Sequence, residues 1–333
     1  RPIVSAFTAT ATREVKDDIA QTLRLRDPEI VITGFDRPNL YYRVETTRRK
    51  DAFVADYVRS HPGESGIIYC ATRKNVDAVQ EMLRGEDISA ARYHAGMTNE
   101  ERRQSQNDFI YDTAPVIVAT NAFGMGIDKS NVRYVIHYNM PQSMENYYQE
   151  AGRAGRDGLP SQCILLFSPQ DIVINRFLLD HKENDDLDDE AADLLRARDN
   201  QRLQAMANYC QTTGCLRNYI LRYFGEEPAE PCGSCGNCDR EFEEVDMTAQ
   251  AKWMINCVAE TRGRYGKGVV LNTLRGANMA RLRELGAMDY RSYGQLKDCT
   301  RDELDCLLAQ LLEEGYLVQT DDQYAVLHLS LIH

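Results

Sequence analysis

The sequence of 333 residues has no apolar run long enough to cross a bilayer, and its first residues lack the order typical of a secretory signal peptide. It also has no excess of positive charge, because its formal net charge is −12. That value argues against a generally basic coat for nucleic acid, although a local basic groove can still bind a polyanion. We therefore expect an intracellular protein without a membrane partner, in the cytoplasm or nucleoid of a bacterium or in a eukaryotic nucleus.

A phosphate-binding loop of the form G-x-x-x-x-G-K-[ST] is also absent. Any nucleoside triphosphate would need a phosphate cradle that this sequence does not itself contain. The chain begins Arg-Pro-Ile-Val, without a methionine and apparently within a strand, so we expect a fragment of a longer protein. Hydrophobic residues make up 43% and charged residues 27%, which is typical of a soluble globular protein of two or three domains.

Two arginines, Arg153 and Arg156, stand in a glycine-rich stretch at residues 149–158, Gln-Glu-Ala-Gly-Arg-Ala-Gly-Arg-Asp-Gly. Arginines three residues apart share one helical face, and the glycines let the backbone approach a bulky ligand. A guanidinium group matches phosphate oxygens in a bidentate manner. The stretch is therefore suited to placing two positive charges against a polyphosphate, although a solvated turn would have the same spacing.

Apolar strands alternate with amphipathic helices through the first half of the chain. We expect an early helix at residues 13–23, a short β-like run at 30–34 and an extended segment at 39–44. Further strands are expected at 66–71, 89–94, 116–119, 134–138 and 162–167, with helices at 74–83, 98–109 and 143–151. Thr98 and Glu101 form a capping box. The alternation predicts a mostly parallel sheet covered on both faces.

Functional residues of such a sheet gather where the strands end. Polar and glycine residues follow three of the expected strands and could grip a phosphodiester backbone or approach a nucleotide closely, but ordinary strand-to-helix loops have a similar composition. The candidates at these positions are Thr72, Arg73, His94, Thr120, Asn121, Gly126 and Asp128.

Ten cysteines in a chain expected to be intracellular favour metal ligands over disulfides. Three of them follow C-x2-C-x2-C spacing, and three thiolates need a fourth ligand to complete a tetrahedral Zn²⁺ site. Cys210 and Cys215 compete for that place. Cys215 is preferred because it lies in the first turn of an expected helix at 214–224, where the helix dipole favours a thiolate. An iron–sulfur cluster and a redox-active cluster are the alternatives for Cys232, Cys235 and Cys238.

An acidic run at residues 183–190 indicates a domain boundary, and residues 191–210 are expected to be helical, with Thr213 capping the helix that follows. The last 90 residues or so predict helices followed by a hairpin, which is the order of a winged helix. Basic residues between 262 and 283 suit backbone phosphates, and a tyrosine near the hairpin tip suits stacking on a terminal base pair. An exposed basic surface and ordinary cross-strand packing are the alternatives for Arg264, Lys267, Arg275, Arg281 and Tyr324.

Taken together, these segments resemble the second motor lobe, zinc-binding platform and winged-helix RQC domain of a RecQ-family superfamily-2 DNA helicase. Residues 5–11 look like helicase motif III, 66–73 like motif IV, 116–129 like motif V and 147–158 like motif VI. The family's C-x16-C-x2-C-x2-C spacing is matched from Cys215. The resemblance covers almost the whole chain and implies a RecA-like α/β lobe with a parallel sheet, a small helical zinc-binding domain and an α+β winged helix.

The resemblance implies that Arg156 is an arginine finger on the γ-phosphate of ATP, with Arg153 and Gln149 assisting and Gly126 and Asp128 beside the nucleotide and its Mg²⁺. It implies structural Zn²⁺ on the four cysteines. It places single-stranded DNA on the motor lobe and a duplex or junction on the winged helix. The other implied partners are a first motor lobe in the same polypeptide, which would hold the phosphate loop, and single-stranded DNA-binding protein.

The expected segments are the end of a first motor lobe with a linker (1–33), the second lobe (34–182), the zinc-binding platform (183–243) and the winged-helix RQC domain (244–333). The predicted function is the C-terminal part of an ATP-dependent 3′-to-5′ DNA helicase for repair and recombination, inactive as this fragment alone. The alternative is a DNA-binding module or regulator that uses the zinc and winged-helix domains without a motor role.

Overall fold

The computed structural model describes residues 4–8, 13–124, 128–181, 189–228, 230–240, 245–320 and 325–330. The chain forms two compact units, one made of Arg1–Glu183 with Arg202–Arg240 and the other of Asn184–Gln201 with Glu241–His333. Within the described residues, no helix is both long and apolar enough to span a membrane.

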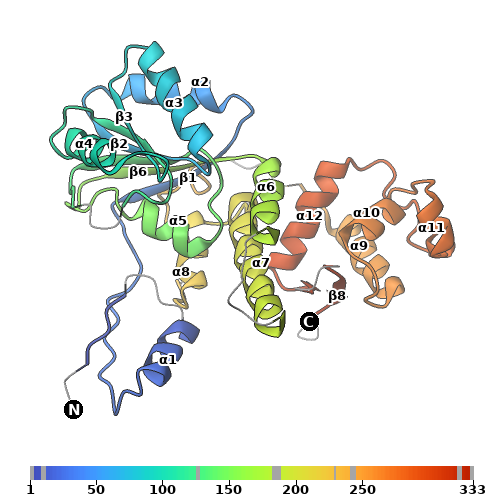
Figure 1. Ribbon diagram of the computed structural model, residues 1–333. Coiled ribbons are helices and arrows are strands. Elements are labelled where there is room, and N and C mark those ends of the chain that lie inside the picture. Colours follow the sequence, from blue (N-terminus) through green and yellow to red (C-terminus); the bar gives the residue numbers. More distant parts are fainter. Residues whose placement is uncertain are drawn as a thin grey trace. The chain divides into compact units, whose positions relative to one another are not determined.

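A six-stranded sheet forms the centre of the first unit, and all of its neighbouring strands are parallel (Figure 1). The strand order is β1-β6-β5-β2-β4-β3. The central strands are buried along their length, as expected where helices cover both faces of a parallel sheet. The predicted α/β lobe is therefore confirmed, with strands β1 (Leu40–Thr46), β2 (Ser65–Tyr69), β3 (Ala90–Tyr93), β4 (Val116–Ala119), β5 (Val132–His137) and β6 (Ser161–Phe167).

Successive residues of each strand belong to opposite faces of the sheet, as Ile67 and Ile68 of β2 illustrate. The face of Ile68 packs against α2 (Lys50–Ser60) and α3 (Arg73–Gly85) through Val54, Val58, Val76 and Val79. The face of Ile67 packs against α4 (Asn99–Ile110) and α5 (Met144–Ala151) through Phe109, Met144 and Tyr147. Figure 1 shows α2 and α3 on one side of the sheet and α5 on the other.

Capping residues explain where several helices of this unit begin. The Thr98–Glu101 capping box is present at the start of α4, as predicted. The helices α2 and α6 (Pro169–Asp180) are absent from the sequence prediction. The second has a sequence signal, because Ser168 and Asp171 form a capping box and Pro169 takes the first helical position.

Two local predictions are wrong. Residues 30–34 form no strand, and the side chains of Ile30, Val31 and Ile32 are exposed. The short helix α1 (Arg13–Thr22) precedes them, close to its expected bounds. The helix expected at 214–224 is α8 (Leu216–Tyr223), and its N-cap is Cys215 and not Thr213, because the Cys215 sulfur accepts the backbone N–H of Asn218 at 3.5 Å.

The second half of α7 (Asp189–Gln211) and α8 complete the first unit beside β1. Leu203 and Met206 of α7 join the same core as Leu216 and Ile220 of α8 and the inward residues of β1, such as Tyr42. This helical region therefore shares one hydrophobic core with the sheet and belongs to the same compact unit.

The second unit contains the helices and the hairpin expected near the end of the chain. Leu317–Gln319 pairs antiparallel with Leu327–Leu329, and residues 321–324 between them lie outside the described residues. Thr300 and Glu303 form a capping box at the start of the last helix. The core of this unit is built from α9 (Thr248–Thr261), α10 (Lys267–Leu274), α12 (Arg301–Glu313), β7 (Leu317–Gln319) and β8 (Leu327–Leu329). The unit also contains α11 (Ala280–Glu284) and the 3-10 turn η1 (Ala287–Asp289).

Candidate functional site

Arg153 is buried directly after α5, and its guanidinium connects two loops at one edge of the sheet. Its Nη1 donates to the carbonyl oxygen of Gly124 at 2.6 Å. A Cβ at Gly124 would overlap that guanidinium, and the residue has a φ of +137°, so glycine is required there for two reasons. Arg153 therefore fixes the loop after β4 against the loop after α5.

Arg156 has the exposed guanidinium of the pair, with its side chain 37% accessible. Its Nη1 lies 4.0 Å from Oδ1 of Asp128, whose side chain is 98% exposed. Burial, and after it the neighbouring charge of Arg153, lower the pKa of Arg156. A partly exposed guanidinium at this position favours an anion as its neighbour. Gln149 is exposed in the last turn of α5, four residues before Arg153, and Gly126 lies outside the described residues.

The ends of β2 and β4 bring the predicted DNA contacts of the first unit together. These strands are paired, with Tyr69 opposite Ala119, so Thr72 and Arg73 follow one strand and Thr120 and Asn121 follow its neighbour. Thr72 caps α3 by accepting the backbone N–H of Asn75 at 3.2 Å. The side chains of Arg73 and Asn121 are exposed, whereas Thr120 is buried.

His94 lies nearby, but both of its ring nitrogens have partners. The backbone N–H of Gly96 donates to Nδ1 at 3.2 Å, which assigns the proton to Nε2, and Nε2 lies 3.2 Å from Oδ1 of Asp77. The side chain is only 8% exposed. The turn held by His94 also lies close to Arg73, because a Cβ added at Gly96 would be 3.3 Å from Cδ of that arginine. This geometry favours a positioning role for His94 over direct contact with DNA.

Four cysteine sulfurs form a cluster that can hold a metal ion, all within 4.8 Å of one another. Four thiolates at about 2.3 Å from a tetrahedral Zn²⁺ lie about 3.8 Å apart; Sγ of Cys232 and Cys238 are separated by 3.9 Å. Cys210 is buried elsewhere in the core, so its sulfur is not the fourth member. The members are Cys215, Cys232, Cys235 and Cys238.

The surroundings of the cluster suit thiolates that bind a cation. Backbone N–H groups of Cys232 and Asn218 donate to the Cys215 sulfur at 3.3 and 3.5 Å. Burial, and then a hydrogen bond with Cys235, raise the pKa of the Cys238 thiol to about 12. Thiols this close do not ionise together without a positive ion, so the donor set fits a metal that displaces their protons.

In the second unit, the basic side chains predicted to contact DNA differ in exposure and in ion pairing. Arg275 and Arg281 are exposed, and Arg264 is exposed with its guanidinium 5.8 Å from the ring centre of Tyr265. Lys267 is paired, because its Nζ lies 3.0 Å from Oδ1 of Asp305. Tyr324 lies outside the described residues.

Three family models match consecutive parts of the chain. The helicase conserved C-terminal domain matches residues 49–158, the RecQ zinc-binding domain matches 169–239 and the RQC domain matches 241–331. The ATP-dependent DNA helicase RecQ of Bacillus subtilis is 41% identical over 330 residues, which cover 99% of this chain and 54% of that protein. The chain belongs to the RecQ family.

A second RecQ relative, the ATP-dependent DNA helicase RecQ of Pasteurella multocida, is 35% identical over 329 residues, covering 98% of this chain and 51% of that protein. The ATP-dependent helicase wrn-1 of Caenorhabditis elegans is 37% identical over 331 residues, covering 94% of this chain and 31% of that protein. The chain spans about half the length of the two bacterial RecQ proteins. The RecQ zinc-binding match contains all four clustered cysteines.

A buried polar pair beneath the arginines of this RecQ chain is absent from the sequence prediction. Nε2 of His137 lies 2.9 Å from Oε2 of Glu150, and the His137 ring stacks on Tyr69 at 5.5 Å. The Tyr69 hydroxyl donates to the carbonyl of Phe123, next to the partner of Arg153. The sequence contains a signal for the burial of Glu150, because this residue is three positions after Tyr147 and shares its helix face.

Proposed function

We propose that this chain is the C-terminal part of the motor of an ATP-dependent DNA helicase that separates duplex DNA in the 3′-to-5′ direction, in repair or recombination. The observation that carries the proposal is Arg156, a partly exposed guanidinium whose loop is fixed to the end of β4 through Arg153. The direction of movement and the pathway come from the family resemblance alone.

In this proposal Arg156 stabilises the charge that spreads over the γ-phosphoryl group of ATP during transfer. Arg153 holds the two loops in register and does not itself reach the nucleotide, because it is buried against Gly124. Gln149, Gly126 and Asp128 complete this side of the nucleotide and Mg²⁺ site. The phosphate cradle would belong to another lobe of the intact protein.

One DNA strand would cross the carboxyl edge of the sheet at β2 and β4. Arg73 and Asn121 are exposed there and would meet its phosphates, while Thr72 and Thr120 shape the two loops. Contacts with phosphates are independent of sequence and strengthen as salt is lowered. Closing and opening of the nucleotide cleft would then move this grip along the strand.

The four clustered cysteines would hold Zn²⁺ as a closed, structural site. When bound, the ion supplies a fixed cross-link between the start of α8 and the loop at residues 232–238. The basic residues Arg264, Arg275 and Arg281 of the RQC domain would hold duplex DNA, with Tyr324 stacking at the hairpin. Single-stranded DNA-binding protein remains a proposed partner.

The chain alone is expected to hydrolyse no ATP above background, with or without DNA, because no phosphate loop occurs in its sequence. The intact protein is expected to hydrolyse ATP and to separate the strands of a duplex with a 3′ single-stranded tail. Phosphate release and strand-displacement assays measure the two. Steady ATP hydrolysis by the isolated chain that disappears in Arg156→Ala would disprove the division of labour between two lobes.

DNA binding by the chain is expected to weaken steeply with salt, and Arg275→Ala and Arg281→Ala should each reduce the slope of log K against log[salt] by about 1 for each lost phosphate contact. Lys297→Ala is the matched control, because Lys297 is an exposed cation of the same unit outside residues 262–283. Fluorescence anisotropy at several salt concentrations measures the slope. If the slopes for Arg275→Ala and Arg281→Ala equal the slope for the Lys297→Ala control, Arg275 and Arg281 do not contact DNA.

A further inference from the structure

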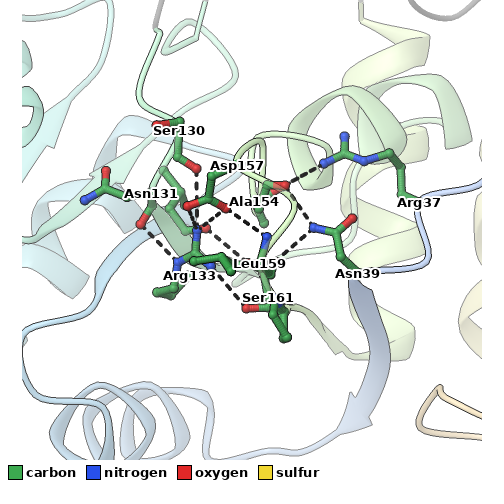
Figure 2. A network of polar contacts seen from close by, with 12 residues as sticks. Arg37, Asn39, Ser130, Asn131, Arg133, Ala154, Asp157, Leu159 and Ser161 are labelled. Carbon is green, nitrogen blue, oxygen red and sulfur yellow. Dashed lines mark hydrogen bonds and ion pairs between the residues drawn. The ribbon is translucent and has the colours of Figure 1, made fainter.

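A short segment at residues 35–40 leads into β1, and the side chain of Arg37 points from it toward the loop that carries the two arginines. We call residues 152–159 the arginine loop. Figure 2 shows Arg37 and Asn39 approaching this loop from one side. The Arg37 guanidinium donates to three backbone carbonyl oxygens of this loop, those of Gly152 (3.3 Å), Ala154 (3.2 Å) and Gly155 (3.1 Å).

Asn39, two residues after Arg37, also donates to backbone carbonyls of the arginine loop. Its Nδ2 donates to the carbonyl oxygens of Gly155 at 2.9 Å and Leu159 at 3.0 Å. Gly155 has a φ of +55°, and a Cβ there would overlap Nδ2 of Asn39. The backbone on either side of Arg156 is therefore shaped around Asn39, and only glycine fits at the closest approach.

The opposite side of the arginine loop is held by Arg133 of β5. Its Nη2 lies 2.7 and 2.6 Å from the two carboxylate oxygens of Asp157, the residue after Arg156. Figure 2 shows this pair across the loop from Arg37 and Asn39. Both chain neighbours of Arg156, Gly155 and Asp157, are thus held by hydrogen bonds from other elements.

The 35–40 segment is itself held from the helical region that contains the cysteine cluster. Arg217, two residues after Cys215, donates to Oδ1 of Asp36 at 2.9 Å and to the carbonyl oxygens of Leu40 at 2.8 Å and Pro38 at 3.3 Å. The Arg217 guanidinium thus holds both the side chain of Asp36 and the backbone at Pro38 and Leu40.

An aromatic contact holds the other end of the segment. The ring of Phe35 stacks on Phe224 at the end of α8, with centroids 4.4 Å apart and planes 9° apart. Its backbone N–H donates to Glu226, and its carbonyl oxygen accepts from the Tyr148 hydroxyl of α5 at 2.8 Å. Residues 36–40 therefore contact Arg217 of α8 and the arginine loop in alternation, one residue after another.

We propose that Arg37 and Asn39 are positioning residues for Arg156, and that Arg217 holds the segment on which they lie. The inference rests on the proposed function of Arg156 as the finger on ATP. A guanidinium displaced by about 1 Å can lose about 100-fold in rate, so the three backbone acceptors of Arg37 matter to catalysis although Arg37 does not touch the nucleotide. The segment thus transmits the placement of α8 to the nucleotide site.

The structural part is tested on this chain by hydrogen exchange, which needs no ATP. The reporters are the backbone N–H groups of Gly155, which donates to Val132, and of Gly158, which donates to Gly155. Arg37→Ala and Asn39→Ala should each accelerate exchange within residues 153–159 by about tenfold or more. Arg59→Ala, an exposed arginine on α2 paired with Asp56 and Glu86, is the matched control and should change nothing there.

The catalytic part is tested in the intact protein by steady-state ATP hydrolysis. Arg37→Ala is expected to lower kcat by about 10- to 100-fold with little change in KM for ATP. Arg37→Lys keeps the charge without the planar fork, so it should fall between the wild type and Arg37→Ala. The double variant Arg37→Ala/Arg156→Ala should be no slower than Arg156→Ala, because Arg37 acts only through Arg156.

The outcomes separate this inference from the proposed function. Unchanged exchange in residues 153–159 in both alanine variants overturns the positioning role directly. Faster exchange with an unchanged kcat, while Arg156→Ala is inactive, also overturns it and leaves the arginine finger in place. If Arg156→Ala itself keeps full ATP turnover, the proposed function fails, and the catalytic claim for Arg37 fails with it. If Arg37→Ala folds poorly, exchange in Asn39→Ala decides the positioning role.

Discussion

Arg156→Ala, made in the intact protein, is expected to lower kcat for ATP hydrolysis by about 10³- to 10⁵-fold, the range over which an arginine finger accelerates phosphoryl transfer. The expected loss is large because the partly exposed guanidinium can reach the charge that spreads over the transferring phosphoryl group. Burial, and after it the charge of Arg153, lower the pKa of Arg156, so a triphosphate beside it would stabilise the charged guanidinium. Steady-state phosphate release with saturating DNA measures kcat and KM for ATP.

The comparison variants for Arg156 separate its charge from its shape. Arg156→Lys retains a cation without the planar fork and should be slower than the wild type but faster than Arg156→Ala. Arg103→Ala is the matched control, because Arg103 is an exposed arginine on α4 whose Nη2 lies 3.7 Å from Glu100. Turnover by Arg156→Ala within a few-fold of the wild type, with normal folding and DNA binding, would remove the arginine from the reaction.

Arg153 cannot serve as the same test, although the family resemblance implies that it assists Arg156. Its buried guanidinium holds the carbonyl of Gly124, so its removal would leave a buried acceptor unpaired and loosen two loops together. A loss of activity in Arg153→Ala would therefore report on folding as well as on chemistry. The structure thus distinguishes the two arginines. Arg156 has a partly exposed guanidinium, whereas that of Arg153 is buried and holds the carbonyl of Gly124.

The strands of the sheet could be predicted from the sequence because their apolar runs are continuous and bounded by polar loops. Residues 116–119 match β4 fully, since a strand buried on both faces shows the strongest pattern. Residues 30–34 have a similar run, Ile-Val-Ile-Thr-Gly, but no neighbouring strand pairs with them within the described residues. A β-rich composition indicates a strand only when the fold supplies a partner edge.

The site could be predicted only in part, because a motif names residue types and not their exposure. His94 has the right chemistry for a phosphate, but its ring is buried with Asp77 and the backbone of Gly96. Arg37 and Asn39 carry no local signal, since their partners are backbone carbonyls more than 110 residues away. Contacts of that kind depend on tertiary packing, which no periodicity within a short window can reveal.

Removal of the metal is expected to unfold the helical region around α8 and to lower the melting temperature of the first unit. Zinc contributes about 10–16 kcal/mol of apparent stability in small zinc domains at pH 7, so a loss of even part of that corresponds to more than about 10 °C. The effect should spread beyond the loop, because Cys235 is fully buried in the shared core. The backbone N–H of Gly236 also donates to the carbonyl of Tyr42 in β1 at 2.8 Å.

Cys215→Ser is the sharpest version of this experiment, with metal content and thermal melting measured on the same samples. It should reduce bound zinc and melting temperature together, as should a chelator strong enough to strip the wild-type chain. Cys210→Ala should keep the metal, because its thiol is buried outside the cluster, and exposed Cys306→Ser should change neither quantity. An unchanged melting temperature after verified metal loss would show that α8 and β1 hold each other without the ion, and the structural role of zinc would have to be abandoned.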